Sequence, residues 1–421
     1  MGWRTVPISE LYEGLFDGPH ATPPPADAGP VFLGIKNVTE DGRLDFSEIR
    51  HISESDFAQW TRRVQPRAGD LVFTYEATLN RYALIPRGFR GCLGRRMALI
   101  RTNPAKIDNR FLYYYFFTSE WRAVVANNVL SGSTVDRIPL TTFPSFPVSL
   151  PSLPEQHRIA DILSAYDQLI ENNLRRIRIL DAMARAVYRE LFATQAPGSA
   201  DQKIEKGQDL PKGWERTTLQ RVCVVGNGVQ TGPFGSQLHQ SDYVDDGVPV
   251  VMPKDLLGFR ISTDSIAKVT PELADKLCRH RVQPGDIVYG RRGDIGRRAY
   301  VTRDEEGWLC GTGCLRIRPD GEQIDGWYLF NYLGQDDIVA FISGRAHGAT
   351  MPNLNTGLLN DVPVVLPPRE LQQLFCEATL PLDNLVGVLR RQVAILRETR
   401  DLLLPRLLSG QIDLADVEPA A

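Results

Sequence analysis

The sequence predicts a mixed α/β fold in which a globular domain and a long helix each occur twice along the chain. Three observations predict it. Short β-branched and aromatic runs are separated by Gly, Pro and Asp turns, which indicates small mixed domains. Two stretches carry apolar residues at alternating spacings of three and four, which is typical of long helices. Dipeptides also recur 216 residues apart: Gly69-Asp70 and Gly285-Asp286, Pro147-Val148 and Pro363-Val364, and Leu150-Pro151 and Leu366-Pro367.

The length and composition allow two such domains in one chain. With 421 residues, each repeat of roughly 200 residues can bury its own core. The hydrophobic fraction of 43% and the charged fraction of 24% are ordinary for a folded protein. No stretch approaches the ~20 apolar residues of a membrane span, and the first residues lack an apolar signal core. We therefore expect a cytoplasmic protein.

The six cysteines are scattered and form no Cys-x-x-Cys pair, so we expect no zinc site. Cys310 and Cys314 lie in Leu309–Arg318, whose alternation predicts a single strand. The net charge of −3 argues against a protein that binds nucleic acid by itself. It is compatible with a subunit whose partners supply most of the phosphate contacts.

Each half begins with a Gly-Trp pair, Gly2-Trp3 and Gly213-Trp214. We predict one domain over residues 1–150 and its repeat over 213–366. The expected strands are 31–35, 71–75 and 97–100, then 248–252, 287–289 and 314–317, and the expected helices are 109–127 and 324–343. The offset grows from 211 at the Gly-Trp pair to 216 further on, so the copies differ most in their early loops. Two domains with one scaffold and different binding surfaces would diverge there.

The two long helices are predicted over 151–196 and 367–412, and the 39 residues of Pro154–Phe192 would span about 60 Å. Asn173 is the polar exception in the pattern; it either fixes the register or is a tolerated polar residue near solvent. Pro381 and Pro405 predict a kinked or segmented second helix. A polar linker, 197–212, joins the halves, and 413–421 is expected to be a flexible tail. The predicted spacer positions are Leu163, Tyr166, Ile170, Asn173, Ile177, Leu180, Val187, Leu382, Val386, Leu389, Val393, Leu396 and Leu403.

No motif for catalysis emerges from the sequence. The glycines of Gly226–Gly232 have the wrong spacing for a dinucleotide-binding turn, and Gly290–Arg298 lacks the Gly-Lys-Ser/Thr of a phosphate-binding loop. The histidines lie in unrelated settings, and the tetrapeptide with which amino-methyltransferases hold a flipped base is absent. The glycines and arginines of Gly290–Arg298 suit an approach to a phosphodiester chain, or alternatively a solvated hairpin rim. We expect no chemistry from this chain itself.

Several segments together resemble one known family, the specificity subunits of type I restriction-modification systems. The likeness covers essentially the whole chain and is most specific in the second half. In the first half, the loop Gly18–Pro25 departs from the Gly-Pro-Phe-Gly-Ser opening of the second, which leaves the DNA contacts of the first domain poorly mapped. The segments that carry the likeness are Thr231–Val244, Gly247–Lys254, Gln283–Gly296, Met351–Asn355, Leu402–Ile412 and Pro151–Ile159.

The resemblance implies a function for each part of the chain. Each domain would be a target-recognition domain that enters the DNA major groove, and the helices would form an antiparallel coiled-coil spacer between the domains. The DNA target would be bipartite and asymmetric. The implied partners are double-stranded DNA, two adenine-methyltransferase (modification) subunits and restriction/translocase subunits of a prokaryotic cytoplasmic complex. S-adenosylmethionine, ATP and magnesium are expected on those partner subunits, with no cofactor or metal on this chain.

Candidate DNA contacts are polar or basic residues in the loops of the two domains, although Asn353 could equally be a turn residue. Any single one of them also has an alternative interpretation as a surface or fold-stabilising residue. For the whole chain, the alternative function is a non-catalytic scaffold that binds protein or RNA partners. The candidates are Lys36, Arg81, Arg95, Arg96, Thr134 and Arg137 in the first domain, and Ser236, Lys254, Arg291, Arg292, Arg297, Thr350 and Asn353 in the second.

Overall fold

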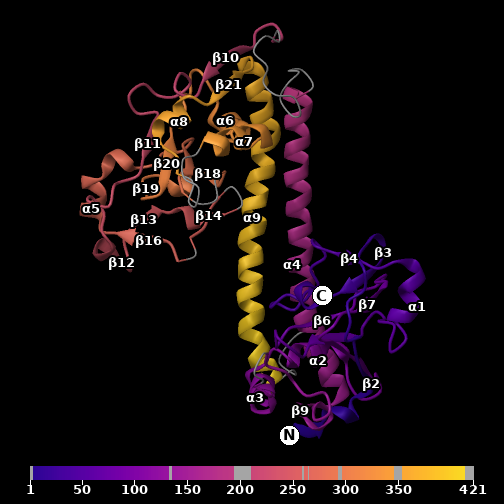
Figure 1. The fold of residues 1–421 in the computed structure, drawn as a ribbon. Coiled ribbons are helices and arrows are strands. Elements are labelled where there is room, and N and C mark those ends of the chain that lie inside the picture. The colour runs from indigo at the N-terminus through magenta and orange to yellow at the C-terminus, as the bar shows by residue number, and fades with distance from the viewer. Residues whose placement is uncertain are drawn as a thin grey trace. The chain divides into compact units, whose positions relative to one another are not determined.

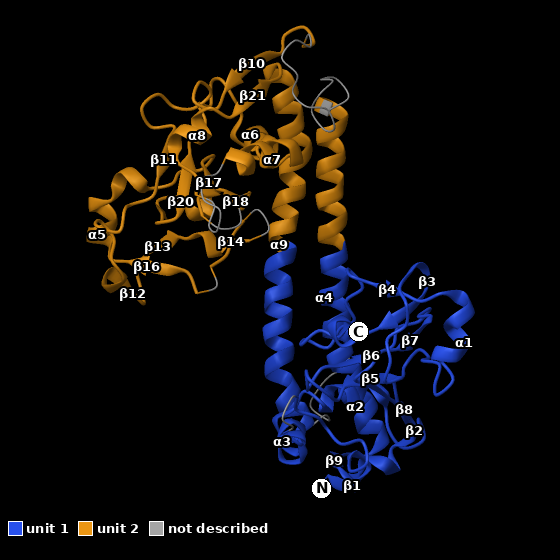
Figure 2. Cartoon of the chain, in the orientation of Figure 1, with its two compact units in different colours: residues 1–175, 389–421 blue, residues 176–388 orange. Residues whose placement is uncertain are grey.

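The computed structural model describes residues 3–131, 135–193, 210–257, 260–263, 265–292, 296–345 and 353–412. It divides into two compact units (Figure 2). Unit 1 consists of Met1–Arg175 together with Leu389–Ala421, and unit 2 is Arg176–Val388. Two long helices, α4 (Leu153–Tyr188) and α9 (Arg369–Leu408), contribute to both units (Figure 1). The remaining elements of the first predicted domain lie in unit 1, and those of the second lie in unit 2.

Unit 1 contains three sheets and three short α-helices. Strand β1 (Arg4–Pro7) pairs with β9 (Pro147–Leu150). A four-stranded sheet has the order β2 (Tyr12–Asp17), β8 (Met97–Thr102), β5 (Leu71–Thr74) and β6 (Tyr82–Leu84). A three-stranded sheet has the order β4 (Arg50–His51), β3 (Ala26–Leu33) and β7 (Gly91–Leu93). The helices are α1 (Phe57–Trp60), α2 (Asn109–Tyr115) and α3 (Ser119–Asn128), with 3-10 turns η1 (Ile8–Glu10), η2 (Ile35–Asn37), η3 (Glu54–Asp56) and η4 (Phe143–Ser145).

Unit 2 has a similar plan, with an added strand pair, a fourth strand in its second sheet and one more short helix among the described residues. Strand β10 (Glu215–Thr218) pairs with β21 (Pro363–Leu366), and β14 (Leu256–Leu257) with β15 (Arg260–Ile261). The first four-stranded sheet has the order β11 (Val229–Thr231), β20 (Cys314–Ile317), β17 (Ile287–Gly290), β18 (Arg298–Tyr300). The second has the order β12 (Tyr243–Val244), β16 (Ala267–Val269), β13 (Val248–Val251), β19 (Leu309–Cys310). The helices are α5 (Pro271–Lys276), α6 (Gly326–Tyr332), α7 (Asp336–Arg345) and α8 (Thr356–Asn360), with turns η6 (Gln240–Asp242), η7 (Pro253–Asp255), η8 (Cys278–His280) and η9 (Arg303–Glu305).

The strand orders confirm the predicted internal repeat of a mixed α/β domain. The order β2-β8-β5-β6 in unit 1 corresponds to β11-β20-β17-β18 in unit 2. In each smaller sheet one pair is parallel, β3 with β7 and β13 with β19. The strands expected from the sequence near residues 31, 71, 97, 248, 287 and 314 are all present.

The repeated Gly-Asp dipeptide forms the same turn in both units. Gly69 and Gly285 have φ of 88° and 93°, a conformation that favours glycine. The buried Asp70 carboxylate accepts a hydrogen bond from the backbone of Arg67 at 2.8 Å and pairs with Arg101 at 2.7 Å. In unit 2, Asp286 accepts from the backbone of Gln283 at 2.8 Å and pairs with Arg318 at 2.7 Å. The dipeptide therefore recurs because it builds a turn and a buried ion pair.

Side chains on the central strands alternate between two cores. In β5, Leu71 and Phe73 join the aromatic core beneath α2 and α3, whereas Val72 faces the core under the smaller sheet. In β17, Ile287 and Val288 divide between two cores in the same way. Because successive side chains of a strand point to opposite faces, one sheet separates two hydrophobic layers in each unit.

The two long helices pack against each other and run antiparallel, as predicted. In unit 1 the Asp167 carboxylate pairs with Arg400 at 2.6 Å, and further along α4 the Asn173 amide donates to the Gln392 side chain at 3.3 Å. In unit 2 the rings of Tyr188 and Phe375 lie 5.7 Å apart. Along these three pairs, the residue numbers on α9 fall as those on α4 rise, so the two helices run in opposite directions. Every one of the thirteen predicted spacer positions is buried or half-buried.

Three sequence expectations about elements need correction. Helix α9 is one element that continues through Pro381 and Pro405, so the expectation of a segmented helix is wrong, whereas that of a kink stays a prediction. The helices expected over 109–127 and 324–343 are each broken in two, because Thr118 caps a new helix by accepting from the Trp121 backbone and because Gly334 interrupts the second. The strand expected over 309–318 is two strands separated by a turn at Gly313, whose φ is 92°. Helix α4 is followed by a short π-helix, η5 (Arg189–Ala193).

Candidate nucleic-acid interface

In unit 1, three of the predicted DNA-contacting arginines come together at the end of β5. The backbone N–H of Thr74 donates to the carbonyl oxygen of Arg81 at 3.1 Å, and that of Tyr75 donates to the carbonyl oxygen of Arg96 at 3.2 Å. The next residue, Glu76, forms a β-bridge with Arg137. The sheet therefore gathers arginines from three separate loops at one strand end.

Two further predicted cations belong to loops tied to this strand end. Lys36 is the middle residue of η2, which follows β3. Arg95 follows Gly94, whose backbone N–H donates to the carbonyl oxygen of Leu33 at 2.7 Å. The guanidinium of Arg81 donates to the carbonyl oxygen of Val38, just beyond η2, at 3.2 Å. Lys36 and Arg95 are exposed, whereas the predicted contact Thr134 lies outside the described residues.

Carboxylates partly balance the charge of this cluster. Arg81 pairs with Glu40 at 3.1 Å and Arg96 pairs with Glu76 at 3.0 Å. Glu40 is 86% exposed, and an ion pair so open to solvent contributes little to stability. A phosphate group could therefore replace Glu40 beside Arg81 at small cost.

Unit 2 builds the equivalent strand end from different side chains. The backbone N–H of Gly290 donates to the carbonyl oxygen of Arg297, and that of Arg291 to Gly313, both at 2.8 Å. Arg292 forms a β-bridge with Asn353, in the place of the Glu76–Arg137 bridge. Four of the predicted contacts are thus brought to one place; Arg292 and Arg297 are exposed, whereas Arg291 and Asn353 are half-buried.

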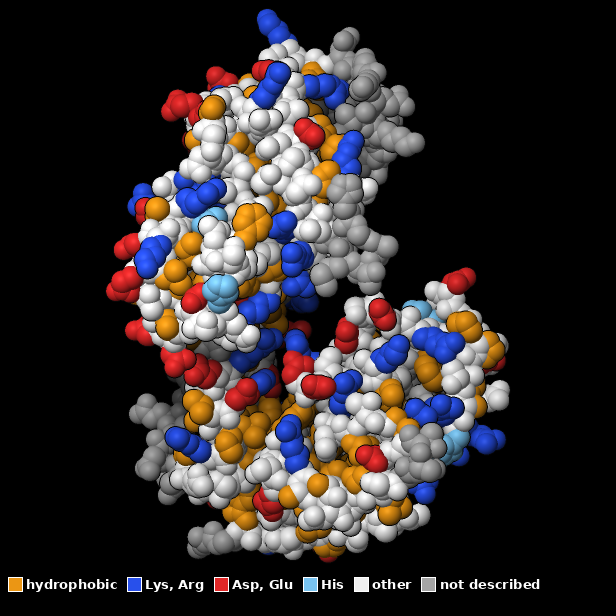
Figure 3. Space-filling view, turned by 60° about the vertical axis from the view of Figure 1, so that its left-hand side comes forward, with side chains coloured by type: hydrophobic (Ala, Val, Ile, Leu, Met, Phe, Trp, Pro, Cys, Tyr) orange, Lys and Arg blue, Asp and Glu red, His pale blue; other side chains and the backbone are white. Residues whose placement is uncertain are grey.

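Lys254 and Ser236 lie in loops beside this strand end. Lys254 is the middle residue of η7, and its ammonium donates to the carbonyl oxygen of Ser265 at 2.9 Å. Ser236 is exposed in the loop after Pro233, whose carbonyl oxygen accepts from the Thr312 hydroxyl at 2.9 Å. On the face of unit 2 drawn in Figure 3, several Lys and Arg side chains lie close together. The predicted contact Thr350 lies outside the described residues.

Not every arginine of the stretch Gly290–Arg298 faces outward. The guanidinium of Arg291 donates to the carbonyl oxygen of Leu354 at 2.8 Å, and burial together with the neighbouring Arg292 lowers the pKa of Arg291. Arg298 is buried, lies 4.8 Å from the centre of the Phe330 ring and donates to the Phe330 carbonyl oxygen. Burial lowers the pKa of Arg298 to about 10. The expectation that Arg298 supplies surface charge was therefore wrong, because strand alternation turns it inward.

Some buried polar atoms around these strand ends lack a hydrogen-bond partner among the described residues. They include the hydroxyl oxygens of Thr74 and Tyr75 in unit 1 and the side-chain oxygen of Asn353 in unit 2. Leaving a buried polar atom unpaired costs about 1–3 kcal/mol.

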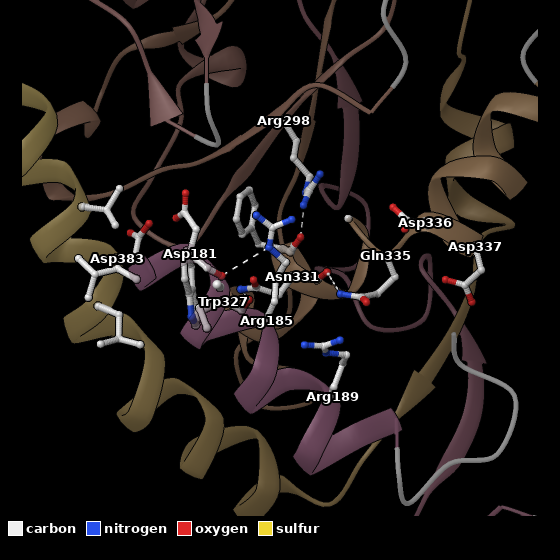
Figure 4. A pocket seen from close by; sticks show the side chains of 17 residues that line it. Asp181, Arg185, Arg189, Arg298, Trp327, Asn331, Gln335, Asp336, Asp337 and Asp383 are labelled. Carbon is white, nitrogen blue, oxygen red and sulfur yellow. Dashed lines mark hydrogen bonds between the residues drawn. The ribbon is translucent and has the colours of Figure 1, made fainter. Parts of the chain in front are cut away.

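A separate hollow in unit 2 has mixed charge. It has a volume of ≈ 420 Å³ and lies between α4, α6, α7 and α9. Figure 4 shows Arg298, Arg185 and Arg189 in its middle, flanked by aspartates such as Asp181 and Asp337. A comparable hollow of ≈ 410 Å³ in unit 1 contains Asp167 and Arg400. Neither has the single-sign surface that suits nucleic acid, and the described residues contain no group of metal-binding side chains.

A stretch of the chain that lies almost wholly in unit 1 matches a known protein family in sequence. Residues 36–179 match the family described as "Type I restriction modification DNA specificity domain". These residues therefore carry the sequence pattern of a type I restriction-modification DNA specificity domain. This confirms the resemblance found in the sequence. None of the helices in the described ranges is long and apolar enough to cross a membrane.

Similarity to type I specificity subunits extends over most of the chain. The MjaIX specificity subunit of Methanocaldococcus jannaschii is 23% identical, over 87% of this chain and 83% of that protein. The EcoBI specificity subunit of Escherichia coli is 22% identical, over 68% of this chain and 63% of that protein. The solved S subunit of a type I restriction-modification system from M. genitalium has a TM-score of 0.63 at 18% identity and covers 97% of this chain and 96% of its own.

One feature of unit 1 was missed in the sequence. Gly18 occupies the place of Gly232. The backbone N–H of Gly18 donates to the carbonyl oxygen of Met97, the first residue of β8, and that of Gly232 donates to the carbonyl oxygen of Cys314, the first residue of β20. A Cβ at Gly18 would collide with the carbonyl oxygen of Gly94, and one at Gly232 with that of Gly311. The signal was present, since Gly18-Pro19 repeats Gly232-Pro233 at an offset of 214.

Proposed function

We propose that this chain is the DNA-recognition subunit of a type I restriction-modification complex and reads a bipartite, asymmetric target. One domain reads each half of the target, and the antiparallel helices set the length of the unread gap. The observation that carries the proposal is the duplicated strand end, which presents clustered cations and polar side chains on one framework in both units. The side chains differ between the copies, so the two half-sites differ.

The chain performs no chemistry in this proposal. Two adenine-methyltransferase subunits dock on it and bring S-adenosylmethionine, and restriction/translocase subunits bring ATP and magnesium. Support comes from the duplication itself, since a two-fold repeat offers two similar surfaces to two copies of one partner. The purified chain alone is expected to transfer no methyl group from S-adenosylmethionine to DNA; measurable transfer would contradict this part of the proposal.

The decisive experiment maps methylated adenines across the host genome by single-molecule sequencing, with and without this gene. The expected result is a motif of two short defined blocks with an undefined gap of constant length, lost when the gene is deleted. A contiguous motif, or methylation that does not depend on the gene, would contradict the proposal.

A further inference from the structure

The two candidate interfaces share one lysine position. In each unit a 3-10 turn follows the strand that pairs in parallel, and its middle residue is Lys36 or Lys254. The third residue caps the turn in both: Asn37 accepts from the backbone of Gly34 at 3.0 Å, and Asp255 accepts from that of Met252 at 2.8 Å. Both lysines are exposed.

The neighbourhood of Lys254 leaves room for another acceptor. The ammonium of Lys254 donates to Ser265 at 2.9 Å and lies 3.8 Å from Asp255. An ammonium has three N–H donors, so an additional bond to a phosphate oxygen is chemically available. The side chain of Lys254 is 58% exposed, so phosphate can approach it from solvent.

The bridge that closes each strand end carries unlike side chains. In unit 1 it pairs the backbones of Glu76 and Arg137, whose side chains are a carboxylate and a guanidinium. In unit 2 the equivalent bridge pairs the backbones of Arg292 and Asn353, whose side chains are a guanidinium and an amide. The backbone is equivalent in both, because the carbonyl oxygens of Tyr75 and Arg291 accept from the residues that follow Arg137 and Asn353, at 2.7 and 2.9 Å. The backbone pairing is therefore the same in both units, whereas the side-chain donors and acceptors beside it differ.

Phosphates and bases place different demands on a duplicated framework. Phosphates are the same in every DNA sequence, so one cation in one place serves both copies. Base edges differ in the major groove, where arginine suits guanine, asparagine suits adenine and glutamate suits the amino group of cytosine. Two domains that read different half-sites must differ where they touch bases.

We infer that Lys36 and Lys254 anchor the phosphate backbone, whereas the bridge pairs Glu76–Arg137 and Arg292–Asn353 determine which bases each domain accepts. The inference rests on the proposed function, because it assigns roles within the same DNA interface. Arginine and asparagine favour guanine and adenine for the pair in unit 2, and arginine and glutamate favour guanine and cytosine for the pair in unit 1.

The lysines are tested by Lys36→Gln and Lys254→Gln in the complex purified through a tag on this full-length chain. Affinity for a duplex carrying the mapped target is measured over a range of salt concentrations. Each substitution is expected to weaken binding about fivefold near physiological salt and to make the slope of log affinity against log salt shallower by about 0.9. The methylated motif should stay the same, and a changed motif would overturn the assignment to phosphate.

The bridge pairs are tested by an exchange in unit 2, Arg292→Glu together with Asn353→Arg, which installs the pair of unit 1. Methylome mapping should show a changed half-site on one side of the gap and an unchanged half-site on the other. The single variant Arg292→Gln alters only an exposed side chain and should relax the base preference at one position. Unchanged motifs in both folded variants would overturn the inference. If the wild type shows no bipartite motif, the proposed function itself fails, so the two failures are distinguishable.

Discussion

At the residue scale, a buried glutamine joins each long helix to the domain before it. The Gln156 side-chain oxygen accepts from the backbone N–H of Asp108 at 3.1 Å, and its amide donates to the carbonyl oxygen of Pro151 at 3.1 Å. Asp108 caps α2 by accepting from the backbone of Arg110 and Phe111. One amide therefore fixes both the start of α4 and a helix of the domain. The equivalent residues in unit 2 are Gln372, Asp325 and Pro367.

Replacing Gln156 by leucine should destabilise unit 1. The variant leaves the N–H of Asp108 and the carbonyl oxygen of Pro151 unpaired in a buried place, which should lower the free energy of unfolding by about 2 kcal/mol. Gln372→Leu should give a similar loss in unit 2. Urea unfolding measures both, with Gln168→Leu at an exposed position of α4 as a control expected within about 0.5 kcal/mol of wild type. A Gln156 variant as stable as this control would refute the anchoring role.

Asp108 should make part of the stability of unit 1 dependent on pH. Burial raises the pKa of its carboxyl, but hydrogen bonds from Arg110 and His157 outweigh burial and leave the pKa below its ordinary 3.8. A carboxyl with a lowered folded-state pKa stabilises the fold above the unfolded pKa and loses this effect as pH falls through the folded pKa. The stability difference between wild type and Asp108→Asn should be constant above about pH 5 and shrink below pH 3.8. Unfolding measured from pH 7 to 2.5 checks this; a difference that stays constant throughout would contradict it.

Only part of the correspondence between the candidate residues of the two copies could be predicted from the sequence. A fixed offset of 216 matches Arg81 with Arg297 and Arg137 with Asn353, as the backbone bonds do. It fails for Lys36, whose counterpart Lys254 lies 218 residues later. Surface loops tolerate insertions at small free-energy cost, so the offset shifts there while the strands keep their register. The inward turn of Arg298 also required knowledge of where β18 begins.

At the element scale, the long helices combine a hydrophobic seam with a few polar pairs. Asn173 is buried and donates to Gln392, so it is not a residue merely tolerated near solvent. A buried polar residue that pairs in only one alignment disfavours slipped alignments of two helices. The periodicity of the sequence predicted this seam because every third or fourth residue of a helix shares a face. It could not predict that α9 would pass through its prolines unbroken, since packing along α9 offsets their local cost.

Pro381→Ala should stabilise the chain. Pro381 is exposed inside α9, has no backbone N–H for the helix, and corresponds to Ala165 in α4. Alanine restores a helical hydrogen bond and relieves the clash of the proline ring, so the free energy of unfolding should rise by up to about 3 kcal/mol. Denaturant unfolding measures the change. Ala165→Pro is the reciprocal variant and should destabilise by a similar amount; a neutral effect of both would show that local helix propensity is irrelevant at this site.

At the scale of the whole molecule, duplication preserves framework interactions and varies the side chains at one edge. Both copies keep the Gly-Asp turn, the buried ion pair and the glutamine anchor. The sequence revealed this plan because turn glycines and buried aspartates recur as the same residues in both copies, and apolar residues recur at heptad spacing in both long helices. Which loops meet at the strand ends could not be predicted, since contacts between distant strands leave no spacing signal. The differing side chains on similar frameworks support the proposal that the two units recognise different half-sites.

Lengthening both helices by one heptad should lengthen the gap in the DNA target. The insertion points are after Arg175 in α4 and after Val388 in α9, where the two compact units divide, so contacts within each unit are kept. Seven residues add about 10.5 Å of helix, which corresponds to about three base pairs of B-DNA, and a whole heptad preserves the hydrophobic seam. Methylome mapping should therefore show both half-sites unchanged and the undefined gap longer by about three base pairs. A control in which the same seven residues replace existing ones should leave the gap as in wild type. If the extended protein methylates the original motif, the helices do not set the distance between the half-sites.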